Sequence, residues 1–283
     1  MKIIVTGAKG QLGTDVVLKL QEKGYTVYGY GRQDLDITNE DQLKNIFQSI
    51  MPDVVIHTAA HTKVDLAESE PDQAYLINSI GTRNVAVAAE KVGAKLVYIS
   101  TDYVFDGSAK EPLHEFQSTN PIGIYGKSKL AGEHFVHDFH SKFFIVRTSW
   151  VYGKHGNNFV NTMLQLGKEM KEISVVADQV GCPTYTVDLA DRIIDLIQTE
   201  RYGVYHISNA GSCSWYEFAV EIFEKAKLDA KVIPCTTKDF PRPAPRPAYS
   251  VLQHMSLKLN GFNEMPDWRK SLNIFLNRLD NAK

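Results

Sequence analysis

The sequence has no long apolar run and no marked excess of charge of one sign. Its 283 residues contain 31 Lys and Arg against 33 Asp and Glu, which gives a net charge of −2. No apolar stretch approaches the roughly 18 residues that a membrane-spanning helix needs. The balanced charge also lacks the basic stripe of a nucleic-acid-binding protein. We therefore expect a globular protein that binds neither membranes nor nucleic acid.

Cysteine is scarce, and the beginning of the sequence lacks a targeting signal. Cys182, Cys213 and Cys235 are odd in number and far apart, which favours free thiols in a reducing cytoplasm. Residues 1–7 enter a strand-like run without the apolar region and cleavage site of a signal peptide. The sequence therefore predicts a cytoplasmic protein of one large domain or two modest ones.

Short β-branched runs alternate with helical patterns in the first half of the sequence. We expect strands at 2–6, 26–29, 53–58, 95–100 and 143–148, and helices at 12–23, from Thr38 as the N-cap to about 50, and at 71–93. Apolar strands alternating with helices predict an α/β fold, a Rossmann-type doubly wound parallel sheet. We place this domain at 1–153, completed by part of 175–200, and a smaller C-terminal substrate lobe mainly at 154–283.

A glycine-rich turn follows the first expected strand. It has the spacing G-x-x-G-x-x-G, and its candidate cofactor-binding residues are Gly7, Gly10, Gln11, Leu12 and Gly13. Such a turn lets backbone N–H groups approach a pyrophosphate at the beginning of a helix. The turn predicts a dinucleotide site, and a plain strand-to-helix turn is the alternative.

The residues after the second strand indicate which dinucleotide binds. An acid near this point usually binds the ribose 2′-hydroxyl of NAD, whereas an Arg accommodates a 2′-phosphate. Arg32 comes before the first acids, Asp34 and Asp36. We therefore predict NADPH with Arg32 facing the phosphate, and keep NADH and a solvated Arg32 as alternatives. Further expected cofactor contacts are Asp36 and Ile37 beside the adenine, Ala59, Ala60 and His61 along the middle of the cofactor, and Ser100, Tyr125 and Lys129.

Tyr125 and Lys129 form a Tyr-x-x-x-Lys pair on an expected helix. Residues four apart share a helix face, so the phenol and the ammonium should converge. The ammonium should then lower the Tyr pKa from roughly 10, which suits acid–base catalysis. Ser100 and Thr101 end the fourth strand at the expected edge of the cofactor. We predict that Thr101 hydrogen-bonds a carbonyl that Tyr125 protonates, with Lys129 as the third catalytic residue.

These motifs together resemble one family. Residues 59–65, 100–107, 147–153 and 181–184 closely resemble segments of the dTDP-4-dehydrorhamnose reductases, which are extended short-chain dehydrogenases/reductases. The resemblance covers essentially the whole chain. It implies NADPH-dependent reduction of the C4 ketone of dTDP-4-dehydro-6-deoxy-L-mannose (dTDP-6-deoxy-L-lyxo-4-hexulose), which gives dTDP-L-rhamnose for cell-surface polysaccharide biosynthesis.

The resemblance also implies roles for single residues. Tyr125 would donate the proton, Lys129 would bind the nicotinamide ribose and tune Tyr125, and Thr101 would polarise the carbonyl. Asp102 and Trp150 fall where the family contacts the sugar nucleotide.

Candidates for the substrate diphosphate come from the chemistry of the side chains. Arg and Lys suit phosphate oxygens, and the candidates are Arg242 and Arg246 in the Pro-rich segment 241–247, with Lys63 as a third. The alternative is a tethering loop with solvated Arg side chains.

Several alternatives stay open at this point. The chain could be another nucleotide-sugar reductase, an epimerase with bound NAD, or a non-catalytic NADP-binding regulatory subunit. Three-residue steps around a helix make His134, His137 and His140 diverge, so we predict no metal site there. Some reductases of the resembled family use Mg²⁺ at a dimer contact, and both a Mg²⁺ requirement and a homodimer stay open.

Overall fold

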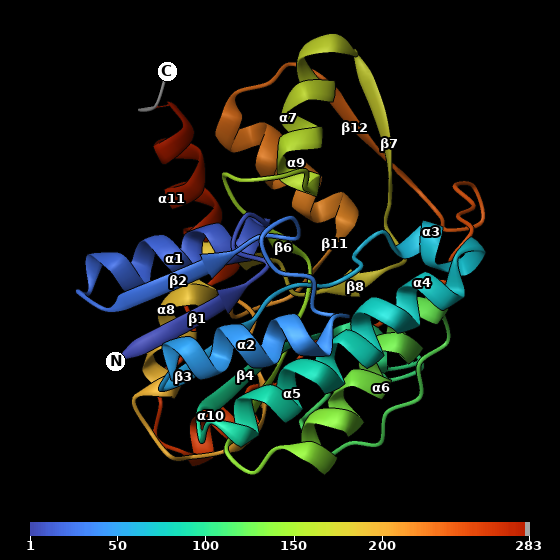
Figure 1. Ribbon diagram of the computed structural model, residues 1–283. Helices are drawn as coiled ribbons and strands as arrows, with labels where there is room; N and C mark the ends of the chain where they lie inside the picture. The colour runs from blue at the N-terminus through green and yellow to red at the C-terminus, as the bar shows by residue number, and fades with distance from the viewer. Residues whose placement is uncertain (281–283) are drawn as a thin grey trace.

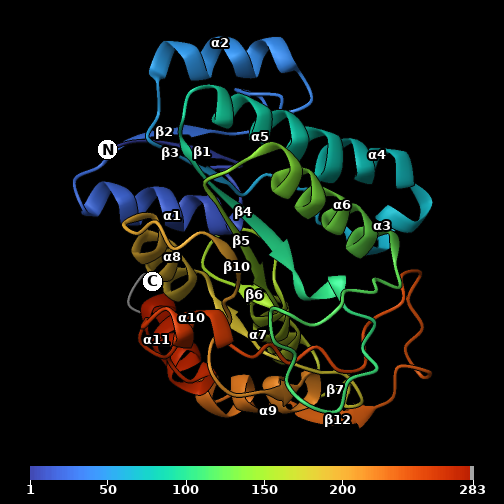
Figure 2. The ribbon, with the colours of Figure 1, turned by 90° about the horizontal axis from the view of Figure 1, so that it is seen from below.

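The computed structural model describes residues 1–280. Its centre is a six-stranded parallel sheet with helices on both faces (Figures 1 and 2). From edge to edge, the strands are β10 (Gly203–His206), β5 (Phe143–Thr148), β4 (Lys95–Thr101), β3 (Val54–His57), β1 (Lys2–Thr6) and β2 (Thr26–Tyr30). The predicted doubly wound Rossmann-type fold is confirmed.

The strands read as continuous apolar runs because both faces of the sheet are covered. Ile3, Ile4 and Val5 in β1 are fully buried, as are Val54 and Val55 in β3. Alternate side chains of a strand point to opposite faces, so a fully buried strand needs a helical layer on each side.

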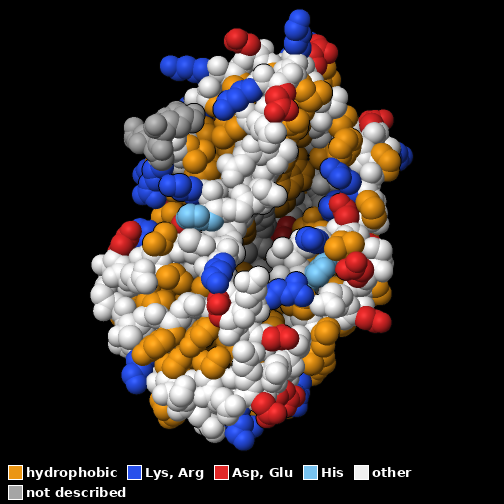
Figure 3. Space-filling model, turned by 45° about the horizontal axis from the view of Figure 1, so that its top comes forward, with side chains coloured by type: hydrophobic (Ala, Val, Ile, Leu, Met, Phe, Trp, Pro, Cys, Tyr) orange, Lys and Arg blue, Asp and Glu red, His pale blue; other side chains and the backbone are white. Residues whose placement is uncertain are grey.

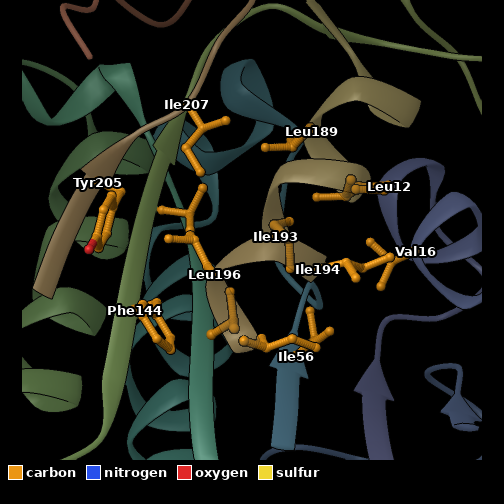
Figure 4. Close-up of a cluster of buried hydrophobic side chains, with 14 of the residues drawn as sticks. Leu12, Val16, Ile56, Phe144, Leu189, Ile193, Ile194, Leu196, Tyr205 and Ile207 are labelled. Carbon is orange, nitrogen blue, oxygen red and sulfur yellow. The ribbon is translucent and has the colours of Figure 1, made fainter. Parts of the chain in front are cut away.

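The two helical layers enclose two separate cores. One face carries α1 (Gln11–Glu22) and α8 (Thr186–Ile197), whose Val16 and Ile193 pack with Phe144 of β5 (Figure 4). The other face carries α2 (Glu40–Ile50), α5 (Thr82–Lys91) and α6 (Ile124–Phe139). Figure 2 shows the sheet seen between these layers.

Two local predictions on this second face are wrong. The N-cap of α2 is Asn39, not Thr38, because the Asn39 side chain accepts the Gln42 amide at 3.0 Å. The single helix expected at 71–93 consists of α4 (Pro71–Tyr75), a π-helical segment η1 (Leu76–Gly81) and α5. Such π-helical turns within helices are frequent at functional sites.

The C-terminal lobe lies over the carboxyl ends of the strands (Figure 1). Its core joins Tyr152, Phe218, Trp268 and Phe275. Its main elements are α7 (Phe159–Glu169), β7 (Glu172–Val176), α9 (Trp215–Ala226), β12 (Lys231–Cys235) and α11 (Trp268–Asp280). Among residues 1–280, no helix is long and apolar enough to cross a membrane.

Short elements connect the lobe and the sheet. They are α3 (Val64–Ser69), the 3-10 turn η2 (Asp102–Val104), β6 (Val151–Tyr152), β8 (Val180–Gly181), β9 (Thr184–Tyr185), β11 (Cys213–Ser214) and α10 (Met255–Leu259). Beyond residue 153 the chain returns to the sheet twice, through α8 against α1 and through β10 beside β5. Residues after 200 therefore also belong to the sheet.

Candidate active site

The glycine turn between β1 and α1 is tightly packed. Gly7 has a φ of +70°, and a Cβ there would lie 2.6 Å from the Ala59 nitrogen. A Cβ on Gly13 would lie 2.2 Å from the Gly7 oxygen. Within the described residues, α1 has no side-chain cap and no acid in its first turn. Its first N–H groups and the positive end of its dipole therefore suit an anion such as a pyrophosphate.

Leu12 and Gln11, two further predicted residues of this turn, contact other parts of the protein. The Leu12 side chain is buried in the core under the sheet. Gln11 donates from Nε2 to the Val151 oxygen at 3.0 Å and accepts from Asn158 at 2.8 Å. Gln11 thereby connects the glycine turn to the C-terminal lobe.

Of the charged side chains just after β2, Asp34 forms an ion pair and Arg32 is exposed. Asp34 forms an ion pair with Lys9 at 2.8 Å and accepts the Gly31 amide at 2.9 Å. Arg32 is exposed and close enough to Asp36 to contribute to the lowering of its pKa, which is caused mainly by hydrogen bonds from Thr38. The first acid after β2 is thus already occupied, and Arg32 is free to meet a phosphate.

The loop after β3 is held by a residue that sequence reasoning missed. Asn78 of η1 accepts the His61 amide at 2.7 Å and donates to the His61 oxygen at 3.1 Å. It also donates to the Ser128 hydroxyl of α6 at 3.0 Å. Ala59 and Ala60 are half-buried in this loop, whereas Ile37 is buried beside η1. No sequence pattern marked the π-helical turn that positions Asn78.

The three predicted catalytic residues lie on two elements that pack together, and the structure brings Thr101 and Tyr125 next to each other. Thr101 is the last residue of that strand, and Tyr125 and Lys129 lie on the first turns of α6. Gly126 lets α6 pack closely on η2, since a Cβ there would lie 2.1 Å from the Tyr103 oxygen. Hydrogen bonding to Thr101 offsets part of a pKa shift at Tyr125, so the two hydroxyls are neighbours.

The charge states in this cluster differ from the sequence prediction. Burial raises the pKa of Tyr125 to about 12, so the predicted lowering by Lys129 is wrong for this structure. The Lys129 ammonium donates to the Ile99 oxygen at 2.6 Å and lies 4.1 Å from the centre of the Tyr98 ring. Burial lowers the pKa of Lys129 to about 7. Lys129 is thus directed at β4 rather than at the phenol.

Asp102 and Ser100 connect the cluster of Thr101, Tyr125 and Lys129 to neighbouring elements. Asp102 accepts from Thr101 at 3.1 Å and from Ser250 of the C-terminal lobe at 2.6 Å. Burial raises the pKa of Asp102 to about 6. Ser100, predicted beside the cofactor, donates its hydroxyl to Glu133. The Ser250 contact joins residues far apart in the sequence, so no local pattern could have revealed it.

Trp150 is held rigidly at the edge of the C-terminal lobe. Its φ of +47° lies in the left-handed region, which is strained for a bulky side chain. Its ring stacks on Trp215 with centroids 3.5 Å apart and planes at 9°. On the other side only glycine fits, because a Cβ on Gly181 would lie 2.6 Å from the Trp150 ring.

The three predicted diphosphate ligands are in different situations. Arg246 forms an ion pair with Asp65 of α3 at 2.9 Å and lies 5.9 Å from the Tyr103 ring. Arg242 is exposed and lies over the Phe240 ring, and Lys63 is exposed just before α3. Of the three, the structure brings only Arg246 next to the aromatic side chains around Tyr125.

A hollow separates the two lobes, and Lys, Arg and His side chains lie on its rim (Figure 3). Beside the Pro-rich loop, an open space of about 570 Å³ is lined by Asp65, Leu66, Glu68, Ser69 and Pro243.

In residues 1–280, no group of three His, Cys, Asp or Glu side chains is placed to hold a metal ion. Burial raises the pKa of Cys182 to about 11, so this thiol is not a reactive thiolate.

A Rossmann sheet with a glycine turn and a Thr–Tyr–Lys cluster defines an oxidoreductase of the short-chain dehydrogenase/reductase class. The family model described as RmlD substrate binding domain matches residues 1–281. The chain belongs to this family. The family and the oxidoreductase class predicted from the sequence are confirmed.

Named relatives cover nearly the whole chain. The Bacillus subtilis (strain 168) spore coat polysaccharide biosynthesis protein SpsK is 43% identical and covers 99% of both chains. The dTDP-4-dehydrorhamnose reductase of Aggregatibacter actinomycetemcomitans is 40% identical over 96% of this chain and 97% of its own. The crystal structure of dTDP-4-dehydrorhamnose reductase from Bacillus anthracis str. Ames in complex with NADP has a TM-score of 0.96 and 55% identity, covering 98% of this chain and 99% of the other.

Proposed function

We propose that this protein catalyses the NADPH-dependent reduction of the C4 ketone of dTDP-4-dehydro-6-deoxy-L-mannose to dTDP-L-rhamnose. The observation that carries the proposal is that the Thr101 and Tyr125 hydroxyls are neighbours at the carboxyl end of β4, with Lys129 one turn further along α6. The glycine turn lies at the same edge of the sheet, where open α/β folds bind ligands. The names of the relatives supply the sugar nucleotide, and the site supplies the chemistry of carbonyl reduction.

The catalytic roles follow from the charge states. NADPH supplies the hydride when it is bound. Because the pKa of Tyr125 is raised to about 12, the phenol keeps its proton at neutral pH and gives it up as the carbonyl oxygen gains negative charge. Thr101 donates a hydrogen bond to that oxygen, and Lys129 stabilises the phenolate that remains. This requires the Lys129 ammonium to move from the Ile99 oxygen towards Tyr125 and the nicotinamide ribose.

The glycine turn supports dinucleotide binding, and two residues after β2 support a preference for NADPH. A Cβ on Gly7 or Gly13 would clash, so both positions need glycine, and the turn directs backbone N–H groups at a pyrophosphate. Arg32 is exposed after β2, whereas the first acid, Asp34, is paired with Lys9. This arrangement favours a 2′-phosphate, in agreement with the NADP in the B. anthracis structure. NADH is the weaker alternative.

For the substrate, we propose that Arg246 is the main diphosphate ligand and that Asp65 releases it when the substrate binds. Asp102 and Trp150 would contact the sugar nucleotide, and Arg242 and Lys63 would lie at the periphery. A cytoplasmic location stays a prediction. The mass of the protein in solution tests for a homodimer, and assays with and without a chelator test for a Mg²⁺ requirement.

The test is NADPH oxidation with the dTDP-4-keto-6-deoxy sugar, supplied by the enzymes that make it, and with NADH in parallel. We expect consumption of NADPH and formation of dTDP-L-rhamnose. A folded protein that binds NADPH but leaves this sugar unchanged would contradict the proposal. It would favour a different keto sugar or a regulatory role, which co-purification with a larger partner protein would reveal.

A further inference from the structure

A second group of buried charges lies one helical turn beyond Lys129. The Glu133 carboxylate accepts two hydrogen bonds from Arg147, from Nε at 3.0 Å and from Nη2 at 2.7 Å. It also accepts a hydrogen bond from the Ser100 hydroxyl. Glu133 is 4% exposed and Arg147 is 6% exposed. The catalytic roles proposed above use neither of them, yet burying such a pair is costly unless it is fully hydrogen-bonded.

The pair ties the catalytic helix to the ends of two strands. Ser100 in β4 and Arg147 in β5 are partners in the strand register, and Thr101 follows Ser100. Lys129 and Glu133 are four residues apart on α6, so their side chains share the face that packs on β4. Glu133 is therefore one helical turn from Lys129 in this buried layer, and its carboxylate is paired with the Arg147 guanidinium.

Apart from Glu133 and Arg147, three titratable groups near Lys129 on the strands and on α6 are neutral at physiological pH. Burial lowers the pKa of His57 in β3 to about 3, and the nearby Lys129 charge adds to this effect. Burial raises the pKa of Tyr98 in β4 well above its ordinary value. Burial also raises the pKa of Tyr125 in α6 to about 12. None of these three groups can balance the Lys129 charge.

The other acids around α6 are bound elsewhere. Asp65 of α3 pairs with Arg246, and Glu68 of α3 accepts the amide of Ile124 at the beginning of α6. Asp102 of η2 accepts hydroxyl groups on both of its oxygens. Burial lowers the pKa of Lys129 to about 7, and the negative charge of Glu133 opposes this lowering.

We infer that Glu133, fixed by Arg147 and Ser100, is a positioning residue whose buried negative charge favours the cationic form of Lys129 near the carboxyl end of β4. A buried ammonium loses its proton readily when no opposite charge is near. On this inference Arg147 should act in the reverse sense, because a positive charge paired with Glu133 weakens the field of Glu133 at Lys129. The catalytic consequence rests on the proposed function, whereas the charge state of Lys129 is a property of the cofactor-free protein.

The test is a pH titration of Lys129 in the cofactor-free protein by NMR with ¹³C-labelled lysine. The Lys129 signal is assigned by its loss in Lys129→Arg. We expect Glu133→Gln to lower the Lys129 pKa by about one unit or more. We expect Arg147→Gln to raise it, since only the repelling charge is removed. Asp138→Asn, an exposed acid on the same helix, is the matched control and should leave the titration unchanged.

The opposite directions of the two expected pKa shifts distinguish an effect of charge on Lys129 from a purely structural role of the ion pair. A supporting role would make both substitutions disturb Lys129 in the same direction, and that result, or no shift in either variant, would overturn the inference. If Glu133→Gln does not fold, a lowered Lys129 pKa in Arg147→Gln overturns it on its own. The double variant removes the whole pair without leaving one buried charge. Its Lys129 pKa should lie between those of the two single variants.

A second arm measures the reaction. With NADPH and the dTDP-4-keto-6-deoxy sugar, the fall of kcat at high pH should begin at a lower pH in Glu133→Gln and at a higher pH in Arg147→Gln. A protein that does not turn over this sugar would refute the proposed function and leave the NMR result to decide the role of Glu133. The two failures are therefore distinguishable.

Discussion

Replacing Gly13 by alanine tests the close contact between the cofactor turn and α1. A Cβ at this position would lie 2.2 Å from the Gly7 oxygen and 2.8 Å from both the Gly7 carbonyl carbon and the Thr58 hydroxyl oxygen. Two of these three atoms belong to the backbone, so no side-chain rotation relieves the clash. The turn must move away from the helix, and the moved turn no longer presents its N–H groups in the same positions.

The expected size of the effect follows from the cost of overpacking. Inserting a methyl group into a packed site costs about 1–3 kcal/mol. At about 2 kcal/mol, Tm should fall by roughly 4 °C for a chain of this size. If about 1.4 kcal/mol of cofactor binding is lost with the moved turn, the Kd for NADPH rises about tenfold. Thermal unfolding and NADPH titration by fluorescence measure the two effects separately.

Gly10→Ala is the matched control within the same turn. Gly10 has an ordinary φ of −83°, and its Cβ would lie 3.1 Å from the Gly7 oxygen. Its Tm should fall by less than half as much as that of Gly13→Ala. Equal Tm values for the two variants, together with wild-type NADPH affinity in Gly13→Ala, would refute the reasoning about the close contact.

Three further predictions concern single side chains. Tyr125→Phe should lower kcat by about 10²–10⁴-fold while the NADPH Kd is kept; near-normal turnover would exclude Tyr125 as the proton donor. Arg32→Ala should weaken NADPH binding about tenfold and leave NADH binding unchanged; an equal loss for both would place Arg32 away from the 2′-phosphate. Because the pKa of Asp102 is raised from 3.8 to about 6, the folded state binds more protons than the unfolded state in that interval, and stability should fall as the pH rises through it. Denaturant unfolding of Asp102→Asn on either side of the interval should lack this slope, and an unchanged slope would contradict the assignment.

Much of the fold could be predicted because it depends on local patterns. The buried runs in β1 and β3 and the glycines around α1 each carry their signal within a few residues. The N-cap of α2 was misplaced by one position, since Thr38 and Asn39 are both good capping residues and only the backbone decides between them. The π-helical turn at 76–81 has no comparable sequence signal, so the sequence predicts a single helix there.

The sequence predicts which residues belong to the candidate site but not their charge states. Spacing brings Tyr125 and Lys129 to one helix face, but it cannot show that burial dominates both pKa values. The contact of Asp102 with Ser250 spans 148 positions of the sequence. The ion pair between Glu133 and Arg147 joins a helix to a strand that follows it. Such contacts become visible only when the elements are packed together.

The return of the chain to the sheet through β10 affects how the protein can be made. During synthesis, β5 has no partner on one side until residues 203–206 emerge, and an unpaired edge strand can pair with other chains. Before residues 186–197 emerge, α1 also lacks α8, whose Leu189, Ile193 and Ile197 fill the core beneath it. The amino-terminal part is therefore exposed to aggregation while the intervening residues are translated. A shortened gene that ends near residue 153 should yield insoluble material, whereas one that extends past β10 and α10 should be the shortest piece worth expressing.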